Sequence, residues 1–131
     1  PGEVPHTDMT SVYAPALRAI LIRAAELEGQ EVTNTATYVC TDGPRFETPA
    51  EIRMFTQLGA HVVGMTGYPE VALAREAGIR YASVAVVSNF AAGTTDEVVE
   101  ESEIWQALET TKEPVFRILR RASQLHTSGE C

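Results

Sequence analysis

Segments whose apolar residues have the spacing of a helix alternate along the chain with short apolar segments typical of strands. The spacing of the apolar residues predicts a helix over residues 14–27, which Gly29 would end. The Val-, Thr- and Tyr-rich stretch 32–40 favours a strand. The same reasoning predicts further helices and strands: helices over 49–58, 69–77 and 96–125, and strands over 60–65 and 79–88.

Local sequence signals sharpen three of these elements. Thr48-Pro49-Ala50-Glu51 is typical of a helix start, because Thr48 can cap, Pro49 suits the first helical position and Glu51 completes a capping box. Residues 79–88 hold the most continuous apolar run, which favours a strand covered on both faces. Pro114 should kink or split the last helix.

The order α-β-α-β-α-β-α predicts an α/β fold with a mostly parallel mixed sheet flanked by helices. The 131 residues suffice for one domain with a sizeable core. Because the chain starts with a turn-like segment and no opening strand, we expect the domain to be incomplete at its amino end.

Charge and composition exclude several classes of partner. A net charge of −8 argues against nucleic acid or an anionic membrane as the main partner, though local donors can still bind a small anion. No apolar run reaches the length of a membrane span, and the first residues lack the features of a signal peptide. Cys40 and Cys131 make no disulfide framework or metal pattern, so we expect a cytoplasmic protein.

Chemistry-bearing side chains gather where the predicted strands end. GPRFET (43–48) follows the first strand, Gly64-Met65-Thr66 ends the second, and Ser88-Asn89 ends the third. Ligands of open α/β sheets sit at the carboxyl ends of the strands. A carboxylate, a hydroxyl, a carboxamide, an aromatic ring and a methionine at this edge suit a flat, hydrogen-bonding heterocycle attached to a small polar group.

With these three motifs in this order, residues 1–93 closely resemble the trimeric nucleoside phosphorylases, the family of purine nucleoside phosphorylase and methylthioadenosine phosphorylase. After Thr94 the likeness weakens. The resemblance implies a phosphorylase-type α/β/α fold and a homotrimer. It also implies reversible phosphorolysis, with inorganic phosphate as co-substrate and neither metal nor organic cofactor. Residues 1–131 would be the carboxyl-terminal part of a single phosphorylase domain, whose amino-terminal half carries the main phosphate-binding residues.

The resemblance assigns the purine to Asn89, Glu47 and Phe46. Asn89 would be catalytic, because an amide can donate to N7 of the departing base and to a carbonyl at its six-position. Adenine-preferring relatives carry aspartate there, and a second aspartate where this chain has Ala91. Glu47 would accept from N1–H of a 6-oxopurine, whereas adenine-type relatives tend to have serine, and Phe46 would wall the base. Asn89 and Ala91, which replace the two aspartates of adenine-preferring relatives, both point to a 6-oxopurine, and Glu47 supports the same substrate.

The remaining expected contacts concern ribose and phosphate. Met65 would lie against the ribose, and Thr66 would donate its hydroxyl to phosphate. His6 would reach a neighbouring subunit's site and cover the 5′ end of the nucleoside, which favours a 5′-methylthio substrate. Each residue also has a structural interpretation: Asn89 as a turn residue, Glu47 as a helix-start carboxylate, Phe46 and Met65 as core, Thr66 as a turn hydroxyl, and His6 as an exposed side chain.

Three functions remain open from the sequence. The first is phosphorolysis of a 6-oxopurine nucleoside such as inosine, guanosine or 5′-methylthioinosine. The second is 5′-methylthioadenosine phosphorylase activity. The third is an inactive fragment that keeps purine contacts but lacks the phosphate site.

Overall fold

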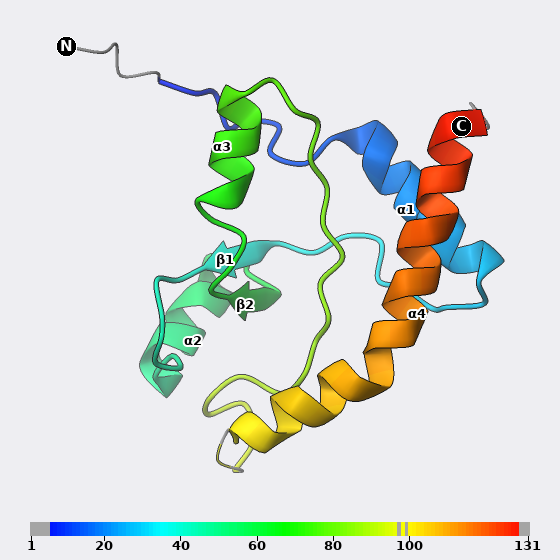
Figure 1. The fold of residues 1–131 in the computed structure, drawn as a ribbon. Coiled ribbons are helices and arrows are strands. Elements are labelled where there is room, and N and C mark those ends of the chain that lie inside the picture. Colours follow the sequence, from blue (N-terminus) through cyan, green and yellow to red (C-terminus); the bar gives the residue numbers. More distant parts are fainter. Residues whose placement is uncertain (1–5, 97, 99, 129–131) are drawn as a thin grey trace.

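Helices flank a short parallel sheet in the computed structural model, which describes residues 6–96, 98 and 100–128 (Figure 1). The elements, in chain order, are α1 (Pro15–Leu27), β1 (Tyr38–Cys40), α2 (Pro49–Gln57), β2 (Val62–Gly64), α3 (Glu70–Glu76) and α4 (Glu101–Ser128). β1 pairs with β2 in parallel, and Tyr38 lies opposite Val62. Parallel strands joined through a helix confirm the predicted α/β class. Cys131 lies outside the described residues.

The core lies between α1 and α4, which pack side by side (Figure 1). Small and branched side chains from both helices are buried there, with Leu17 and Leu21 packed against them: Ile20, Ala24, Ala25, Ile118, Ala122 and Leu125. The helical spacing of the apolar residues predicted part of this core correctly: Ile20, Ala24, Ile118 and Ala122 are buried. Three further residues with the same spacing, Leu27, Leu108 and Leu119, remain 47%, 42% and 47% exposed. At one end of this core, Glu28 accepts a hydrogen bond of 2.9 Å from Arg121.

The start of α2 is formed as the sequence predicts. The Thr48 side chain accepts from the Glu51 backbone N–H, and the Glu51 carboxylate accepts from the Thr48 backbone N–H at 2.7 Å. This reciprocal capping box satisfies two donors that a helix start leaves open. The helix ends at Gln57, and Gly59 follows with a φ of 83°.

One predicted strand, 32–40, is shorter than expected, and another, 79–88, is absent. Residues 32–37 are exposed and not in a strand, because β2 spans three residues and pairs only with 38–40. Residues 79–88 are not assigned to a strand at all. Among the described residues, no backbone hydrogen bond joins 82–88 to a neighbouring segment, so the apolar run lacks the partner that a strand requires. In Figure 1 this segment crosses between the sheet and α4.

The last helix differs from its prediction at both ends. It begins at Glu101 rather than near Asp96, and it continues to Ser128, three residues past Leu125, the last buried residue of the helix. Pro114 lies inside the helix without splitting it, and Figure 1 shows α4 bending along its orange part. No helix among the described residues is both long and apolar enough to span a membrane.

Candidate functional site

Asn89 lies in the loop that follows the extended segment 79–88. Its Oδ1 accepts from the Ser88 hydroxyl at 2.6 Å, and its Nδ2 donates to the Phe90 carbonyl at 2.8 Å. An amide nitrogen carries two hydrogens, so the bond to Phe90 uses one of them. The half-buried amide is thereby held in place by its own loop.

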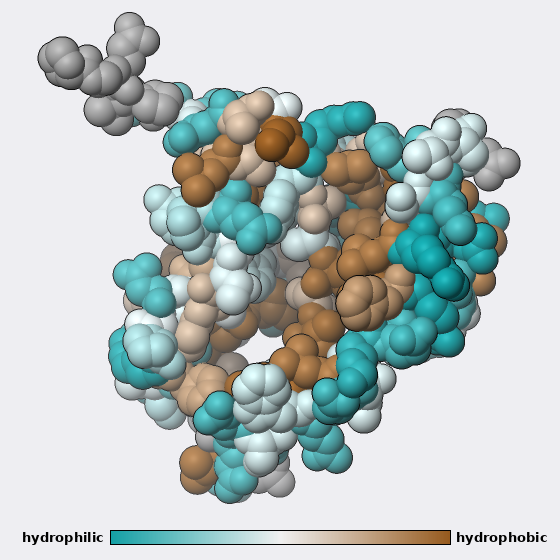
Figure 2. Space-filling view, viewed as in Figure 1, coloured by the Kyte–Doolittle hydropathy of each residue, from teal (hydrophilic) through white to brown (hydrophobic). Residues whose placement is uncertain are grey.

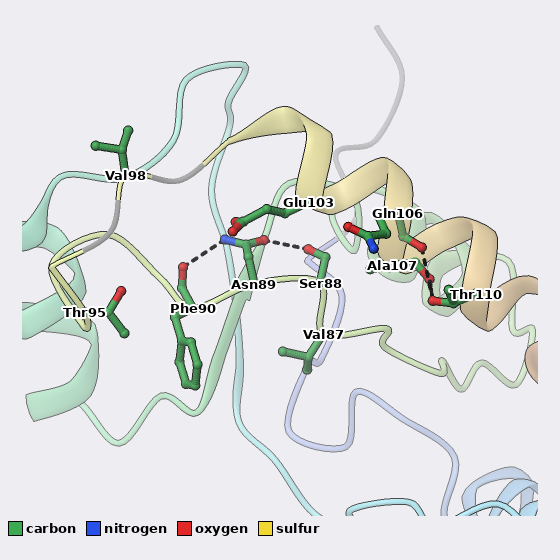
Figure 3. A pocket seen from close by; sticks show the side chains of 10 residues that line it. All are labelled: Val87, Ser88, Asn89, Phe90, Thr95, Val98, Glu103, Gln106, Ala107 and Thr110. Atoms are coloured by element: carbon green, nitrogen blue, oxygen red, sulfur yellow. Dashed lines mark hydrogen bonds between the residues drawn. The ribbon is translucent and has the colours of Figure 1, made fainter.

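An open pocket of about 550 Å³ lies beside Asn89 (Figure 3). Its walls are the loop and the first turns of α4, and its lining residues are Val87, Ser88, Asn89, Phe90, Thr95, Val98, Glu103, Gln106, Ala107 and Thr110. In Figure 3 the side chain of Glu103, from α4, extends toward Asn89. These walls offer amide, carboxylate and hydroxyl groups beside apolar Val87 and Phe90.

The α4 side of this pocket was missed by sequence reasoning. Glu103 belongs to an acidic stretch that is also typical of a solvated helix start, so its charge alone gave no signal. A usable signal existed in the spacing of Glu103, Gln106 and Thr110, which places them on one face of a helix.

Glu47 lies at the carboxyl end of β1. Its Oε1 accepts from the Thr41 hydroxyl at 2.6 Å, and the Thr41 backbone N–H donates to Gly64 O at the end of β2 at 2.9 Å. Glu47 is half-buried, whereas Phe46 keeps 41% of its surface exposed. The carboxylate is therefore tied to the strand edge where the sequence placed the site.

Neighbouring Arg45 is held by the helix start. Its guanidinium makes two hydrogen bonds to the Glu51 carboxylate, at 2.7 and 2.9 Å. These bonds, with those from Thr48, lower the pKa of Glu51 to about 2, and the same pair raises the pKa of Arg45. This bidentate pair orients Arg45 toward α2.

Met65 and Thr66 follow β2 and contact the loop after β1. Gly43 has a φ of 64°, and a Cβ added there would lie 2.6 Å from Met65 Sδ, so the two loops touch. The Thr66 backbone N–H donates to the Tyr38 hydroxyl at 3.5 Å, and its side chain is exposed. The loops after β1 and β2 thus form one edge, as predicted.

A second close contact joins the Asn89 loop to the segment that carries Glu47. A Cβ added at Gly93, whose φ is 71°, would lie 2.6 Å from Pro49 Cβ. Pro49 is two residues after Glu47, so all three predicted motifs belong to one connected group of loops. Glu47 and Phe46 are nevertheless not among the residues that line the pocket beside Asn89.

His6 lies apart from this group of loops. It is exposed, and nearby Asp8 is held on α3 by Arg75, whose Nε donates to the Asp8 carbonyl at 3.2 Å. Figure 1 places the blue start of the described chain beside α3, away from the yellow-green loop that precedes α4. His6 therefore does not meet the other predicted residues within one copy of the chain.

The site contains carboxylates but no cluster suited to a metal. Among the described residues, no three His, Cys, Asp or Glu side chains group together closely enough to hold an ion. No Lys or Arg lines the pocket beside Asn89. A phosphate dianion at this edge would need cationic partners from elsewhere.

Comparison with known proteins decides the family. Residues 1–123 match the model of the Phosphorylase superfamily. The chain belongs to this superfamily. The chain is 47% identical, over 91% of its length, to a probable S-methyl-5′-thioinosine phosphorylase from Methanopyrus kandleri, and it covers 46% of that relative. It is 44% identical, over 93% of its length, to the 6-oxopurine nucleoside phosphorylase of Pyrococcus furiosus, again covering 46%.

Solved structures of two relatives have the same fold as this chain. A methylthioadenosine phosphorylase from Schistosoma mansoni in complex with adenine superposes on 95% of the chain, with a TM-score of 0.90 and 30% identity, and 49% of that structure is covered. A methylthioadenosine phosphorylase from an antarctic soil metagenomic library gives a TM-score of 0.85 at 33% identity, over 99% of this chain and 47% of that one. The chain thus spans about half the length of the relatives it matches.

Proposed function

We propose that this chain is the purine-binding part of a nucleoside phosphorylase, which transfers the pentosyl group of a 6-oxopurine nucleoside to inorganic phosphate. The observation that carries the proposal is the joining of three loops at one edge: Met65 packs on Gly43, and Gly93 packs on Pro49. This brings the segments of Asn89, Glu47 and Thr66 together. The names of the Methanopyrus and Pyrococcus relatives support the substrate class.

In the proposed reaction, a phosphate oxygen forms a bond to C1′ of the ribose while the bond from C1′ to purine N9 breaks. The electron pair of the broken bond goes to the purine, where negative charge develops. Asn89 would donate its amide N–H to N7 and stabilise that charge in the transition state. The proton that phosphate gives up on forming the bond to C1′ passes to the purine, so the base leaves as a neutral purine and the sugar leaves as a 1-phosphate.

Selectivity for a 6-oxopurine would come from Glu47 acting with Asn89. An ionised carboxylate accepts from the N1–H of hypoxanthine or guanine, whereas adenine presents a bare acceptor at N1. Binding the base requires Glu47 to share its Thr41 hydrogen bond or rotate toward the ligand. Phe46, still partly exposed, would pack on the purine ring.

The remaining contacts of the proposal lie beyond the base. Met65 would lie against the ribose and Thr66 would donate to phosphate, while the cations that phosphate needs would come from a part of the domain that this chain does not span. His6, which lies away from the loops, would act across a homotrimer interface on the 5′ group of a neighbouring nucleoside. The reaction needs no cofactor, and we place the protein in the cytoplasm.

Two other functions have a specific observation in their favour. The Schistosoma structure, a methylthioadenosine phosphorylase with adenine, favours methylthioadenosine as the substrate. The coverage of only 46% of the Methanopyrus relative favours a piece that binds purine without turning it over.

Base release separates these functions. The 131-residue chain, alone and as part of a complete domain, is assayed with phosphate and inosine, 5′-methylthioinosine or 5′-methylthioadenosine. We expect turnover only from the complete domain, with both 6-oxopurine nucleosides ahead of methylthioadenosine. A preference for methylthioadenosine would contradict the roles of Asn89 and Glu47. Turnover by the isolated chain would contradict the assignment of the phosphate cations to another part of the domain.

A further inference from the structure

The pocket beside Asn89 has a polar wall on its α4 side. Glu103, Gln106 and Thr110 line this wall. The neighbouring stripe of the same helix is largely apolar, with Trp105 and Phe116 exposed on it, and Figure 2 shows hydrophobic surface beside α4 along a hollow of the molecule. A ligand group that reaches α4 from the Asn89 pocket therefore meets hydrogen-bonding side chains, although an apolar stripe is available next to them.

Only some of these polar groups are available to a ligand. The Thr110 hydroxyl donates to the backbone carbonyls of Gln106 and Ala107, at 3.1 and 3.0 Å, so its hydrogen is used within the helix. The carboxamide of Gln106 and the carboxylate of Glu103 are left as the groups with open hydrogen-bonding capacity on this wall.

Glu103 differs from neighbouring carboxylates of the helix in having no partner of its own. Glu101 accepts a hydrogen bond from Trp105 Nε1 at 3.2 Å, and Glu109 forms an ion pair with Lys112. Within the part of the chain that the structure describes, the Glu103 carboxylate makes no hydrogen bond or ion pair. Its side chain extends toward Asn89 instead (Figure 3). A carboxylate in this position can accept from a ligand hydroxyl.

The proposed base contacts decide which part of the nucleoside meets this wall. Asn89 lines the pocket and Glu47 does not. A purine held at N1 by Glu47 and at N7 by Asn89 therefore has its six-membered ring toward β1 and its five-membered ring, which bears the sugar, at the pocket. The volume of about 550 Å³ is in the range of pockets that hold small molecules.

The stereochemistry of the sugar then selects the 5′ end. In a β-nucleoside the base and C5′ lie on the same face of the ribose, and the attacking phosphate approaches from the opposite face. A wall beside Asn89 is therefore placed for the 5′ group and not for phosphate. The negative charge of Glu103 agrees with this assignment, because it would repel a phosphate dianion.

We propose that Glu103 accepts a hydrogen bond from the 5′-hydroxyl of the nucleoside, and that Gln106 donates an amide N–H to the same oxygen. This inference rests on the proposed function and goes beyond it, since inosine and 5′-methylthioinosine carry the same purine. A thioether has no hydrogen to donate, and its sulfur is a weak acceptor. The site therefore prefers a 5′-hydroxyl, which is opposite to the expectation drawn from His6.

Three nucleosides that release the same base isolate the effect of the 5′ group. The complete domain is assayed with phosphate and inosine, 5′-deoxyinosine or 5′-methylthioinosine, and kcat/KM is measured from the release of hypoxanthine. We expect kcat/KM for inosine to exceed that for each of the other two by about 10-fold or more, because they lack the hydrogen bond to a charged group. The contacts of Asn89 and Glu47 with the base are common to all three nucleosides.

A matched pair of substitutions assigns the preference to Glu103. Glu103→Ala removes the carboxylate from the pocket, and Glu113→Ala removes one from an exposed position of the same helix outside it. We expect Glu103→Ala to lower kcat/KM for inosine by about 10-fold or more and that for 5′-deoxyinosine by less than about twofold. Glu113→Ala should leave the ratio of the two unchanged. Because both side chains are exposed, both variants should keep their helical circular dichroism.

Two results would overturn this proposal and leave the proposed function in place. Inosine and 5′-deoxyinosine could react equally well, or Glu103→Ala could slow both to the same extent, which would assign Glu103 to the base or to the fold. If none of the three nucleosides released hypoxanthine, the proposed function itself would be overturned, and this inference with it.

Discussion

Asn89 is the side chain on which the proposed choice of purine depends. Its amide is held by Ser88 and Phe90 at the wall of an open pocket, so a ligand there meets a preorganised donor and acceptor. The sequence could predict its place after an apolar run. It could not predict the opposite wall, because Glu103 and Gln106 reach the pocket only through the packing of a helix that begins twelve residues later.

Substituting Asn89→Asp in the complete domain should reverse the preference for the base. A carboxylate has no N–H to donate to purine N7, so kcat/KM for inosine should fall by about 100-fold or more, the usual effect of losing one transition-state donor. The carboxylate can instead accept a hydrogen bond from the amine of a 6-amino purine. Activity toward the matching 6-amino nucleoside should rise relative to inosine. Asn34→Asp, the same change at an exposed position outside the pocket, serves as control. Equal losses on both nucleosides would argue against a role in base selection.

Gly43 tests the contact between the loops after β1 and β2. Gly43→Ala places a Cβ 2.6 Å from Met65 Sδ at a φ of 64°, whereas Gly29→Ala has a similar φ of 67° and open space around it. Left-handed backbone costs an alanine about 1–2 kcal/mol. We expect Gly29→Ala to lower the free energy of unfolding, measured in urea, by about that amount. Gly43→Ala should lower it further, because the Met65 side chain must also move. Similar losses of unfolding free energy in both variants would show that the Met65 side chain can move aside at little cost.

At the scale of elements, the features that the sequence predicts correctly are those set by residues close together in the chain. The capping box of α2 and the buried stripe of α1 are local patterns, and both form as expected. Residues 79–88 have the composition of a strand, but a strand exists only where another backbone lies alongside. Residues 32–37 do not extend β1, because β2 is only three residues long and pairs with 38–40. Residues 82–88 make no backbone hydrogen bonds to another segment among the described residues. Propensity alone cannot supply that partner.

The start of α2 should carry a measurable pH dependence. Arg45 and Thr48 lower the pKa of Glu51 from 4.5 to about 2 in the folded chain. A depressed folded pKa means that this carboxylate stabilises the fold above about pH 4.5, and that the contribution is lost as the pH falls from there through about 2. The protection of the first-turn amides of α2 against exchange, measured relative to their intrinsic rates at each pH, should therefore fall across that window.

Glu51→Gln provides the comparison for this pH effect. The neutral amide keeps the shape of the side chain but has no charge to lose, so the protection of the first-turn amides should depend less on pH between about 4.5 and 2. Identical acid dependence in both chains would assign the effect to other carboxylates.

At the scale of the whole molecule, an acidic chain that spans about half of its relatives' length brings three loops into contact. The pocket beside Asn89 has no cationic lining, and an extended apolar segment lies open beside α4. We therefore expect the base-binding contacts in this chain and the phosphate-binding cations in another part of the domain.

The most direct measurement is a crystal structure of the complete domain with hypoxanthine and phosphate. We predict Asn89 Nδ2 at about 2.9 Å from purine N7, and a Glu47 carboxylate oxygen at about 2.8 Å from N1 of the same base. A base bound elsewhere, or bound with Glu47 still directed only at Thr41, would contradict the account.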